Sequence, residues 1–430
     1  MAVEILESSL VLPREETPKN GLWVSNIDLV AARGYTPTIY VYRSHGGPGS
    51  FSPEVLKAAL AKALVVFYPL AGRLGFDRTG RVEISCTGEG ARFITARSDS
   101  YTVDDFKDFA PTAEMRQKFV PAVDSADPPC IMLMLQATSL KCGGVVLGFA
   151  IHHLAFDGRG AALFIQTFSA IARGDSAAIA TLPLPFLDRT ILRARSPPSV
   201  LFDHRDCSSK VFQSGSPSPC VTANLKLSKD YLSILKRCCG AARVSTFRAI
   251  VAHIWRCTCI ARGLASDAET QLFLPVDVRS RVKPPLPLNY MGNAGFRTKA
   301  VAKVGELVSN TLGFGAERVQ TAIERVNDGY VKSFVDYLES VDLESLSKRG
   351  GMPNTSLCAI SWLGMPMYDA DFGWGEPEVM SRAQMYGSGF VYIMGGTDKD
   401  GEISVVIGLE TDSMQRFKKI FYEEPSVVVA

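Results

Sequence analysis

Two adjacent histidines stand out among the five in the chain, because an acidic residue and a glycine-rich turn follow them. Residues 145–153 alternate like a strand, which places the side chains of His152 and His153 on opposite faces. Asp157 lies four residues after His153, and Gly158 then leads into a predicted helix. An imidazole at the end of a core strand, beside such a turn, is both positioned and approachable, as a general base must be.

Spacing alone leaves two interpretations of this pattern open. Either His153 is a general base, or it is a core histidine and Asp157 only caps the helix, since H-x-x-x-D is short and common. A zinc hydrolase is disfavoured because Leu154 stands where H-E-x-x-H requires glutamate. A serine hydrolase is disfavoured because residues 387–389 lack the G-x-S-x-G spacing. Neither G-x-G-x-x-G nor a Walker A loop occurs.

The elements expected around His153 are short strands and helices of a mixed fold. β-branched and aromatic residues indicate strands, and apolar residues at three- and four-residue intervals indicate helices. Ser52-Pro53-Glu54 has the cap, the first-turn proline and the acidic residue of a helix start. The sequence thus predicts strands over residues 35–42, 130–136 and 145–153, a helix from Pro53, and a helix over residues 158–172.

The second half of the chain repeats this mixed pattern after a change of composition. Residues 182–220 are rich in proline and serine but keep apolar residues that can dock, which favours a crossover linker over disorder. We therefore expect a mixed α/β (α+β) protein with an N-terminal domain over residues 1–181 and a C-terminal domain over residues 221–430.

Composition excludes several classes of protein. Hydrophobic residues make up 47% of the 430 residues and charged residues 21%, as in a folded protein rather than a disordered one. The net charge of +2 gives no reason to expect nucleic acid or an anionic membrane as partner. The ten cysteines lack C-x-x-C spacing, which favours reduced, mostly buried thiols without a metal. No targeting segment or membrane span is apparent, so we expect a cytoplasmic protein.

Two separated motifs resemble the signatures of the BAHD acyltransferases, the plant CoA-dependent family. His153-Leu-Ala-Phe-Asp157-Gly158 is similar to H-x-x-x-D-G, and Asp371-Phe-Gly-Trp-Gly375 matches D-F-G-W-G letter for letter. Further matches include residues 68–74, residues 277–281 and Tyr290-Met-Gly-Asn293, so the resemblance covers nearly the whole chain. Two distant motifs in the family's order favour the general-base role for His153.

The resemblance implies two chloramphenicol-acetyltransferase-like domains with the active-site channel at their interface. His153 would take a proton from the acceptor, which attacks the thioester carbonyl directly, without an acyl-enzyme. The developing oxyanion needs a donor, and the resemblance offers the indole N–H of Trp362. The partners implied are a small acyl-CoA donor and a small acceptor. The coenzyme A thioester is a co-substrate of what we expect to be a monomer, with no bound cofactor.

Other residues receive supporting roles from the same resemblance. Asp157 is expected to pair with Arg279 and so fix the turn at Gly158, rather than to relay a proton. The loop formed by Asp371, Gly373, Trp374 and Gly375 is expected to be structural, because aromatic residues between glycines suit a packed loop.

Two groups of residues match substrate positions of the family but also have ordinary structural explanations. Thr36, Thr38 and Tyr40 match acceptor- or acyl-pocket positions, and a core strand would look the same. Ser245, Thr246 and Arg248 lie at a predicted helix start, where they could meet CoA or simply cap the helix.

The sequence departs from the family pattern at one position that bears on the choice of acceptor. Several segments resemble the hydroxycinnamoyltransferase branch, which commonly carries T-S-W-V-R-L-P before D-F-G-W-G, with an arginine that grips the acceptor carboxylate. Here Gly364 stands at that arginine position, and glycine cannot form the bidentate pair. Similar grass enzymes acylate amines such as putrescine, agmatine or tryptamine. We therefore expect an amine N-hydroxycinnamoyltransferase, with hydroxyl acceptors such as shikimate, quinate or glycerol as the alternative and a non-catalytic relative as the third possibility.

Overall fold

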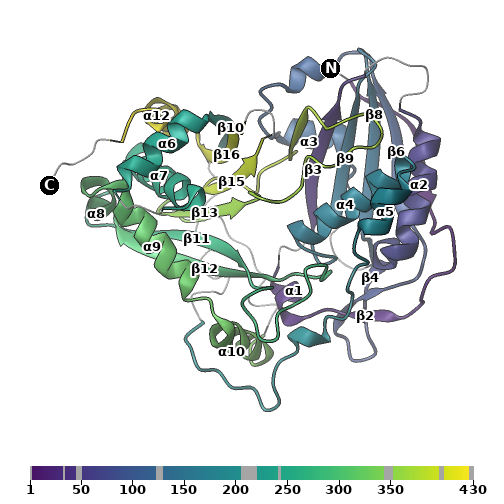
Figure 1. Ribbon diagram of the computed structural model, residues 1–430, viewed down its shortest axis with the longest axis horizontal. Helices are drawn as coiled ribbons and strands as arrows, with labels where there is room; N and C mark the ends of the chain where they lie inside the picture. The colour runs from purple at the N-terminus through teal and green to yellow at the C-terminus, as the bar shows by residue number, and fades with distance from the viewer. Residues whose placement is uncertain are drawn as a thin grey trace. The chain divides into compact units, whose positions relative to one another are not determined.

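The chain forms two compact units whose segments alternate along the sequence (Figure 1). The computed structural model describes residues 2–31, 34–44, 51–122, 129–204, 220–240, 244–342, 352–396 and 401–425. Unit 1 consists of residues 1–193, 286–294 and 365–384, and unit 2 consists of residues 194–285, 295–364 and 385–430. Within the described ranges, no helix combines the length and the apolar character that a bilayer crossing requires.

Unit 1 is built on a six-stranded sheet and a smaller four-stranded sheet. Its strands are β1 (Glu4–Val11), β2 (Gly21–Trp23), β3 (Tyr35–Tyr42), β4 (Arg73–Phe76), β5 (Val82–Ser85), β6 (Ala91–Ser98), β7 (Cys130–Ile131), β8 (Leu133–Leu140), β9 (Val145–His152) and β14 (Val379–Arg382). Its helices are α1 (Asn26–Val30), α2 (Pro53–Val66), α3 (Ala113–Phe119), α4 (Gly158–Ala172) and α5 (Ser176–Thr181), with short 3-10 turns η1 (Tyr68–Ala71), η2 (Val103–Phe106) and η3 (Thr190–Leu192).

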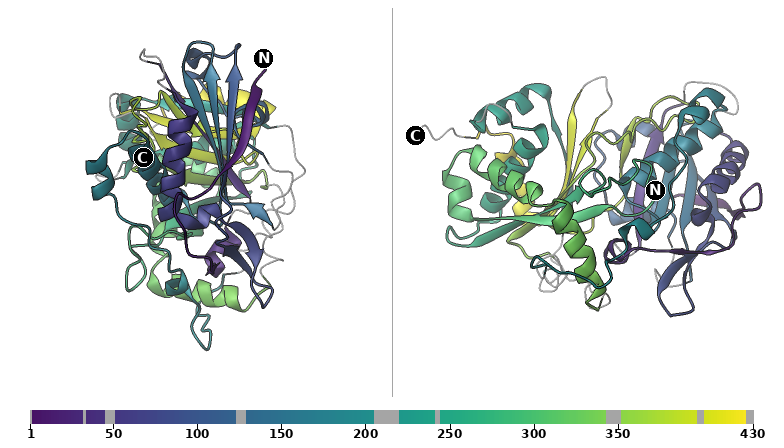
Figure 2. Two further views of the ribbon diagram at one scale, coloured as in Figure 1. Left: turned by 90° about the vertical axis from the view of Figure 1, so that its right-hand side faces the viewer. Right: turned by 60° about the horizontal axis from the view of Figure 1, so that its bottom comes forward.

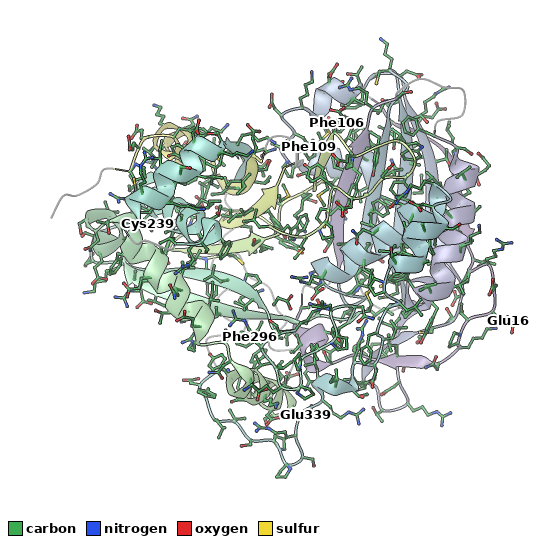
Figure 3. All side chains as sticks on the ribbon, in the orientation of Figure 1. Glu16, Phe106, Phe109, Cys239, Phe296 and Glu339 are labelled. Carbon is green, nitrogen blue, oxygen red and sulfur yellow. The ribbon has the colours of Figure 1, made fainter. Side chains whose placement is uncertain are left out.

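The six-stranded sheet has the order β1-β6-β8-β9-β3-β14, and helices cover both of its faces. One face carries Val146 and Ala150 of β9 and packs against Phe119 of α3 and the ring of Phe106, which Figure 3 labels. The other face lies on the side of α4, as the packing of Tyr42 against Phe372, and of Phe372 against Phe168 of α4, shows. The smaller sheet has the order β2-β5-β4-β7.

Unit 2 has one six-stranded sheet of order β10-β16-β15-β13-β11-β12. Helices α6, α7 and α9 pack together on it (Figures 1 and 2), and the apolar core includes the fully buried Trp255. The elements are β10 (Cys220–Leu227), α6 (Lys229–Cys238), α7 (Thr246–Ala261), β11 (Glu269–Asp277), β12 (Gly295–Lys303), α8 (Val304–Ser309), α9 (Leu312–Glu324), α10 (Asp328–Glu339), β13 (Ser356–Ser361), β15 (Phe390–Gly395), β16 (Ile403–Glu410) and α12 (Thr411–Phe421).

The local sequence signals predict the elements near His153 well. The strand over residues 35–42 and the helix over residues 158–172 have the predicted bounds, and β9 ends one residue earlier than predicted. The Ser52 hydroxyl accepts a hydrogen bond from the Val55 N–H at 3.3 Å and caps α2. The predicted strand over residues 130–136 is instead divided between β7 and β8.

The units do not follow the continuous ranges expected from composition. Residues 286–294 and 365–384 come from the second half of the chain, yet they belong to unit 1. In the second range β14 pairs with β3 at the edge of the large sheet, and in the first range Asn293 donates to Asp28. The Asp371 loop therefore lies in unit 1, whereas the sequence assigned it to the C-terminal domain. Of the predicted linker over residues 182–220, residues 205–219 lie outside the described residues; η3 is its one assigned helical turn in the described part.

Candidate active site

The two adjacent histidines leave the end of β9 on opposite faces, as alternation predicts. His152 is 1% exposed, and its ring packs edge-on against Tyr35 at 5.3 Å between centroids, on the face covered by α3. The His153 N–H donates to the Gly34 carbonyl at 2.9 Å, so the backbone ladder extends to this residue. His153 is half-buried on the opposite face. Of the two histidines, His153 is therefore the one whose side chain is more exposed.

Asp157 closes the turn that carries His153. Its Oδ1 atom accepts hydrogen bonds from the N–H groups of Arg159 and Gly160 at 3.2 and 3.3 Å, which makes it the N-cap of α4. Its Oδ2 atom accepts from the Ala294 N–H at 3.1 Å, and its own N–H donates to the Gly292 carbonyl at 3.4 Å. Both oxygens therefore bind backbone groups, in keeping with a structural role.

The environment of His153 favours a neutral imidazole. Burial lowers the pKa of His153, the nearby Asp157 carboxylate opposes this shift, and the positive charge of Arg382 adds to it. The Nδ1 atom of His153 is buried and has no hydrogen-bond partner among the described residues. A neutral imidazole has an unprotonated ring nitrogen, which is the form that a general base requires.

The predicted pocket residues share the sheet face of His153. In the β3–β9 register, Thr36 lies opposite Ile151 and Thr38 lies opposite Phe149, and directly paired residues project to the same side. Tyr40 is fully buried on this face, and its hydroxyl has no hydrogen-bond partner within the described chain. The structure therefore places all three predicted residues of β3 on the sheet face of His153, with Thr36 nearest to the histidine along the strand and Tyr40, opposite Leu147, farthest from it.

Arg382 on β14 is a site residue that the sequence did not suggest. It pairs in register with Thr38, is 2% exposed, and donates from Nε to the Gln384 carbonyl at 3.0 Å. Its effect on the pKa of His153 comes from this placement. No local signal identifies it, because strand β14 is short and its pairing with β3 joins residues far apart in the sequence.

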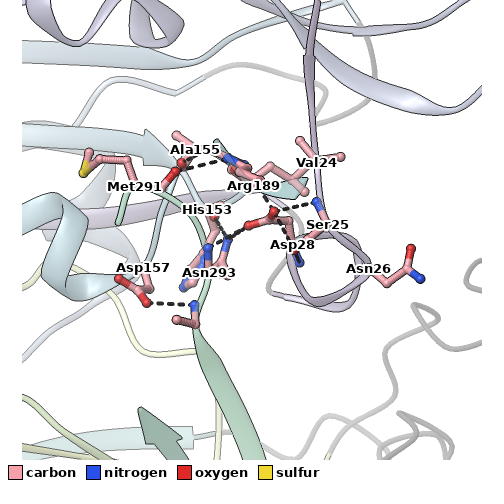
Figure 4. Close-up of polar contacts among 12 residues, drawn as sticks. Val24, Ser25, Asn26, Asp28, His153, Ala155, Asp157, Arg189, Met291 and Asn293 are labelled. Carbon is pink, nitrogen blue, oxygen red and sulfur yellow. Dashed lines mark hydrogen bonds and ion pairs between the residues drawn. The ribbon is translucent and has the colours of Figure 1, made fainter. Parts of the chain in front are cut away.

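A second buried group also was not predicted from the sequence: Asp28, Arg189 and Asn293 lie next to the turn that follows His153 (Figure 4). Asn293 donates from Nδ2 to the His153 carbonyl at 2.9 Å, and Arg189 donates to the carbonyls of Leu154 and Ala155. Asn293 was noticed only as part of a family match, and it lies 140 residues from His153 along the chain.

The Asp371 loop is packed and polar contacts close it. A single oxygen, Oδ1 of Asp371, accepts hydrogen bonds from the N–H groups of Gly373, Trp374 and Gly375 at 2.8 to 3.0 Å. The Phe372 ring stacks with that of Trp374 at 5.3 Å between centroids. Gly373 and Gly375 have φ values of +92° and +83°, which favour glycine.

Unit 2 carries Trp362 and Gly364. Trp362 is 7% exposed, its backbone N–H donates to the Ile393 carbonyl at 2.8 Å, and its ring packs edge-on against Tyr392. Gly364 has φ of +71°, and a Cβ atom built there meets nothing within 4 Å. A Cβ atom at this position would therefore meet backbone strain but no close neighbouring atom.

The remaining predicted residues of unit 2 have local partners. Arg279 is 2% exposed and its Nη1 atom lies 3.2 Å from Oδ1 of Asp277; its expected pairing with Asp157 stays a prediction. The Ser245 hydroxyl caps α7 by accepting from the Arg248 N–H at 3.3 Å. Arg248 also contacts Gln320 through Nη1. The Ser245 bond is ordinary helix capping and the Gln320 contact joins α7 to α9, so contact of Ser245, Thr246 or Arg248 with CoA stays a prediction.

The other described histidines serve packing. His253 donates from Nε2 to the Phe421 carbonyl at 2.7 Å, and His204 makes a 2.9 Å contact with the Ser333 hydroxyl. Burial lowers the pKa of each to about 4. Most described cysteines are buried, as expected. Within the described ranges, no cluster of three or more metal-ligating side chains occurs. His45 lies outside the described residues.

The chain is similar to known proteins over nearly its full length. The Transferase family model matches residues 1–424. Putrescine hydroxycinnamoyltransferase 1 of Oryza sativa subsp. japonica is 50% identical over 446 aligned residues, covering 99% of each chain. Shikimate O-hydroxycinnamoyltransferase of Nicotiana tabacum is 41% identical, covering 98% of this chain and 100% of the relative.

Solved structures share the fold at lower identity. F. graminearum TRI101 complexed with coenzyme A and T-2 mycotoxin superposes with a TM-score of 0.77 at 20% identity, covering 93% of this chain and 97% of that one. This likeness confirms the expected fold class, a mixed α/β protein with two chloramphenicol-acetyltransferase-like domains.

Proposed function

Because the chain belongs to the Transferase family, the BAHD acyltransferases whose two signatures it carries, we propose that it transfers a hydroxycinnamoyl group from hydroxycinnamoyl-CoA to an amine. The chain is a CoA-dependent acyltransferase. The observation that carries the choice of acceptor is the 50% identity, over 99% of both chains, to a putrescine hydroxycinnamoyltransferase. Gly364 supports this choice, since it cannot form the arginine–carboxylate pair expected for shikimate or quinate.

His153 is the general base of the proposed reaction. It accepts a proton from the acceptor nitrogen while that nitrogen attacks the thioester carbonyl carbon. The tetrahedral intermediate then expels coenzyme A as a thiolate, which takes the proton back from the imidazolium. The placement of His153 supports this role. Its half-buried ring lies on the sheet face opposite His152, and burial lowers its pKa, which keeps the ring neutral at pH 7.

The supporting residues of the proposal act on the oxyanion, the pocket and the cosubstrate. Trp362 would donate its indole N–H to the oxyanion. Thr36, Thr38 and Tyr40 would line the pocket on the His153 face. The unpartnered buried hydroxyl of Tyr40 supports this assignment, because a buried hydroxyl without a partner is costly. Ser245, Thr246 and Arg248 would meet coenzyme A.

An amine acceptor gives the reaction a distinctive dependence on pH. An alkylammonium ion has a pKa near 10.4 by analogy with lysine, and it has no lone pair for attack. With subsaturating putrescine, the rate should therefore rise about tenfold per pH unit as far as about pH 10. A hydroxyl acceptor would show only the ionisation of His153, so the pH profile separates the two classes of acceptor.

A hydroxyl acceptor is the second candidate function. It is favoured by the 41% identity to a shikimate O-hydroxycinnamoyltransferase over the full length of that relative. The same base and the same thioester chemistry serve both acceptors, so only the acceptor pocket distinguishes them.

A competition assay tests the proposal. Purified protein receives p-coumaroyl-CoA with equal concentrations of putrescine, agmatine, tryptamine, shikimate, quinate and glycerol, and products are identified by mass. We expect amides to dominate. Dominant esters would replace the proposal by the second candidate, and absence of CoA thiol release with every donor and acceptor would indicate a non-catalytic relative. His153→Ala protein is the blank.

The proposal extends to the state of the protein in the cell. We place it in the cytoplasm as a monomer that binds a small acyl-CoA and a small acceptor, but neither a nucleic acid nor a membrane. Gel filtration with light scattering on the full chain tests the monomeric state, and a doubled mass would contradict it.

A further inference from the structure

Asp28 is a fully buried carboxylate, and two of its partners, Arg189 and Asn293, bind the turn that follows His153. Its Oδ2 atom accepts from the N–H and the hydroxyl of Ser25, both at 2.8 Å, and lies 3.3 Å from Nη1 of Arg189. Its Oδ1 atom accepts from the backbone N–H and from Nδ2 of Asn293, at 2.7 and 2.8 Å. One carboxylate therefore joins α1, the segment before η3, and the segment before β12 (Figure 4).

Stability alone is a weak reason for such a group. Arg189 is 1% exposed, so both charges are removed from water, and a buried ion pair often stabilises a fold no better than apolar residues of the same size. Helix α1 has only five residues; Ser25 is its N-cap, and Asp28 accepts from the Ser25 N–H in the capping box, a role that a neutral glutamine also fills. The pair is therefore better explained by the conformation that it selects.

The conformation selected is that of the backbone at three consecutive carbonyl groups after β9. Asn293 donates from Nδ2 to the His153 carbonyl at 2.9 Å. Arg189 donates from Nη1 to the Leu154 carbonyl at 2.8 Å and from Nη2 to the Ala155 carbonyl at 2.5 Å. Asp28 holds both donors at once. The backbone that leaves β9 with the histidine is thus bound, carbonyl by carbonyl, to one buried network.

The imidazole depends on this backbone. Its Nδ1 atom is buried without a hydrogen-bond partner among the described residues, and the hydrogen bonds that act on the pKa of the ring come from Asn293 and from the backbone of His153 itself. The Gly34 carbonyl fixes the N–H of His153, and the network fixes the carbonyl of His153. A change of the carbonyl directions would rotate the peptide planes that carry the side chain.

We propose that Asp28, Arg189 and Asn293 are positioning residues that set the orientation of the His153 imidazole by binding the carbonyls of His153, Leu154 and Ala155. The inference deepens the proposed function, on which it rests for the role of His153 as base. Asp28 and Arg189 do not touch the imidazole through any bond of this network; they act through the turn.

The test compares two buried aspartates. Asp28→Asn keeps the shape of the side chain but places an amide where Arg189 and Ser25 donate. Asp336→Asn is the matched control, because Asp336 is 1% exposed and accepts from the N–H and Nε of Arg195 and from the Ser199 N–H at 2.7 to 2.9 Å in unit 2. Both variants should have lower melting temperatures than the parent.

Only the first variant should lose catalysis. We expect kcat/KM for Asp28→Asn to fall about 10²-fold, since small misplacements of catalytic groups have effects of this size. The KM for p-coumaroyl-CoA should be unchanged. The acidic limb of the pH profile should move to higher pH, because a loosened turn exposes the ring while the charges of Asp157 and Arg382 remain. Asp336→Asn should keep the parent's kcat and pH profile.

A chemical probe reports on His153 without relying on transfer. Diethyl pyrocarbonate modifies neutral imidazoles, and peptide mass spectrometry measures the rate at His153. This rate should increase in Asp28→Asn and stay at the parent's value in Asp336→Asn. If Asp28→Asn does not fold, Asn293→Ala takes its place, since it removes one amide and leaves the ion pair intact.

The outcomes separate the two hypotheses. A folded Asp28→Asn variant with the kcat, pH profile and modification rate of the parent would overturn the positioning role. If the parent shows no transfer with any acceptor, the proposed function fails, and the modification rates alone then decide whether the network positions His153.

Discussion

Two turns of unit 1 carry the two family signatures, and one aspartate organises each. Asp157 uses both oxygens: one caps α4, and the other accepts from the Ala294 N–H. Asp371 uses one oxygen for three successive N–H groups of its own loop. The first aspartate therefore connects two distant segments, whereas the second closes a loop on itself.

The side chains that the two turns present differ as well. The first presents the half-buried imidazole of His153. The second presents Phe372 and Trp374, whose rings pack on Tyr42. The comparison teaches that a turn organised by an aspartate can either position a candidate catalytic side chain or pack aromatic rings between a strand and a helix. The side chain next to the aspartate decides between the two roles.

The largest expected effect concerns the histidine that the first turn presents. His153→Ala should lower kcat by about 10²- to 10⁴-fold through loss of the base, whereas His152→Ala should fold and keep much of the activity because His152 faces α3. The release of CoA thiol from p-coumaroyl-CoA measures both. Equal losses in two folded variants would show that the wrong imidazole has been assigned.

A smaller effect is expected at Gly364, which precedes the second signature in the sequence. Gly364→Arg should weaken use of putrescine by on the order of tenfold, because the new cation repels the ammonium. Weak activity toward shikimate should appear if the arginine pairs with its carboxylate. Steady-state kinetics with putrescine, tryptamine and shikimate measure these changes.

Gly364→Ala is the control for that substitution. It shares the strain of a positive φ but adds no charge, so its amine kinetics should match the parent's. Unchanged amine kinetics in a folded Gly364→Arg protein would mean that this position does not border the acceptor, and the preference for amines would lose its support from Gly364.

The two aspartates should respond differently to the same conservative change. Asp157→Asn places an amide against the Ala294 N–H, and Ala294 is fully buried, so about 1–3 kcal/mol of stability should be lost. Asp371→Asn can keep its one accepting oxygen and should have a smaller effect. Thermal unfolding of both variants measures the difference, and equal melting temperatures would end the distinction between the two turns.

Arg279 tests whether Asp157 has a partner in unit 2. The family resemblance pairs Arg279 with Asp157, and removal of either member of such a pair leaves the other charge uncompensated, so we predict that Arg279→Ala lowers the melting temperature as Asp157→Asn does. A variant of either residue that melts like the parent yet is inactive would give that residue a direct part in the reaction.

The smallest expected effect is on the way the melting temperature depends on pH. His204 and His253 are buried neutral, and burial lowers the pKa of each to about 4, against about 6.5 when unfolded. The unfolded chain therefore binds more protons between these values, so their contribution is complete above pH 6.5 and is lost as pH falls toward 4. His253→Gln should reduce the fall in melting temperature between pH 7 and pH 5. An unchanged fall would assign it to other groups.

The sequence by itself determined the local features of this protein. Alternation separated His152 from His153, capping and helical spacing located α4, and the two signatures identified the family. These features are encoded over a few residues, because strand parity and helix caps depend on neighbours in the chain.

Only the tertiary structure decided what surrounds the histidine. Asp28 and Asn293 are 265 residues apart in sequence, and Arg382 reaches the His153 face through a four-residue strand from the second half of the chain. No periodicity relates such residues. Their contacts follow from the order of strands in the sheet and from the need to satisfy every buried polar group, and both are properties of the folded chain as a whole.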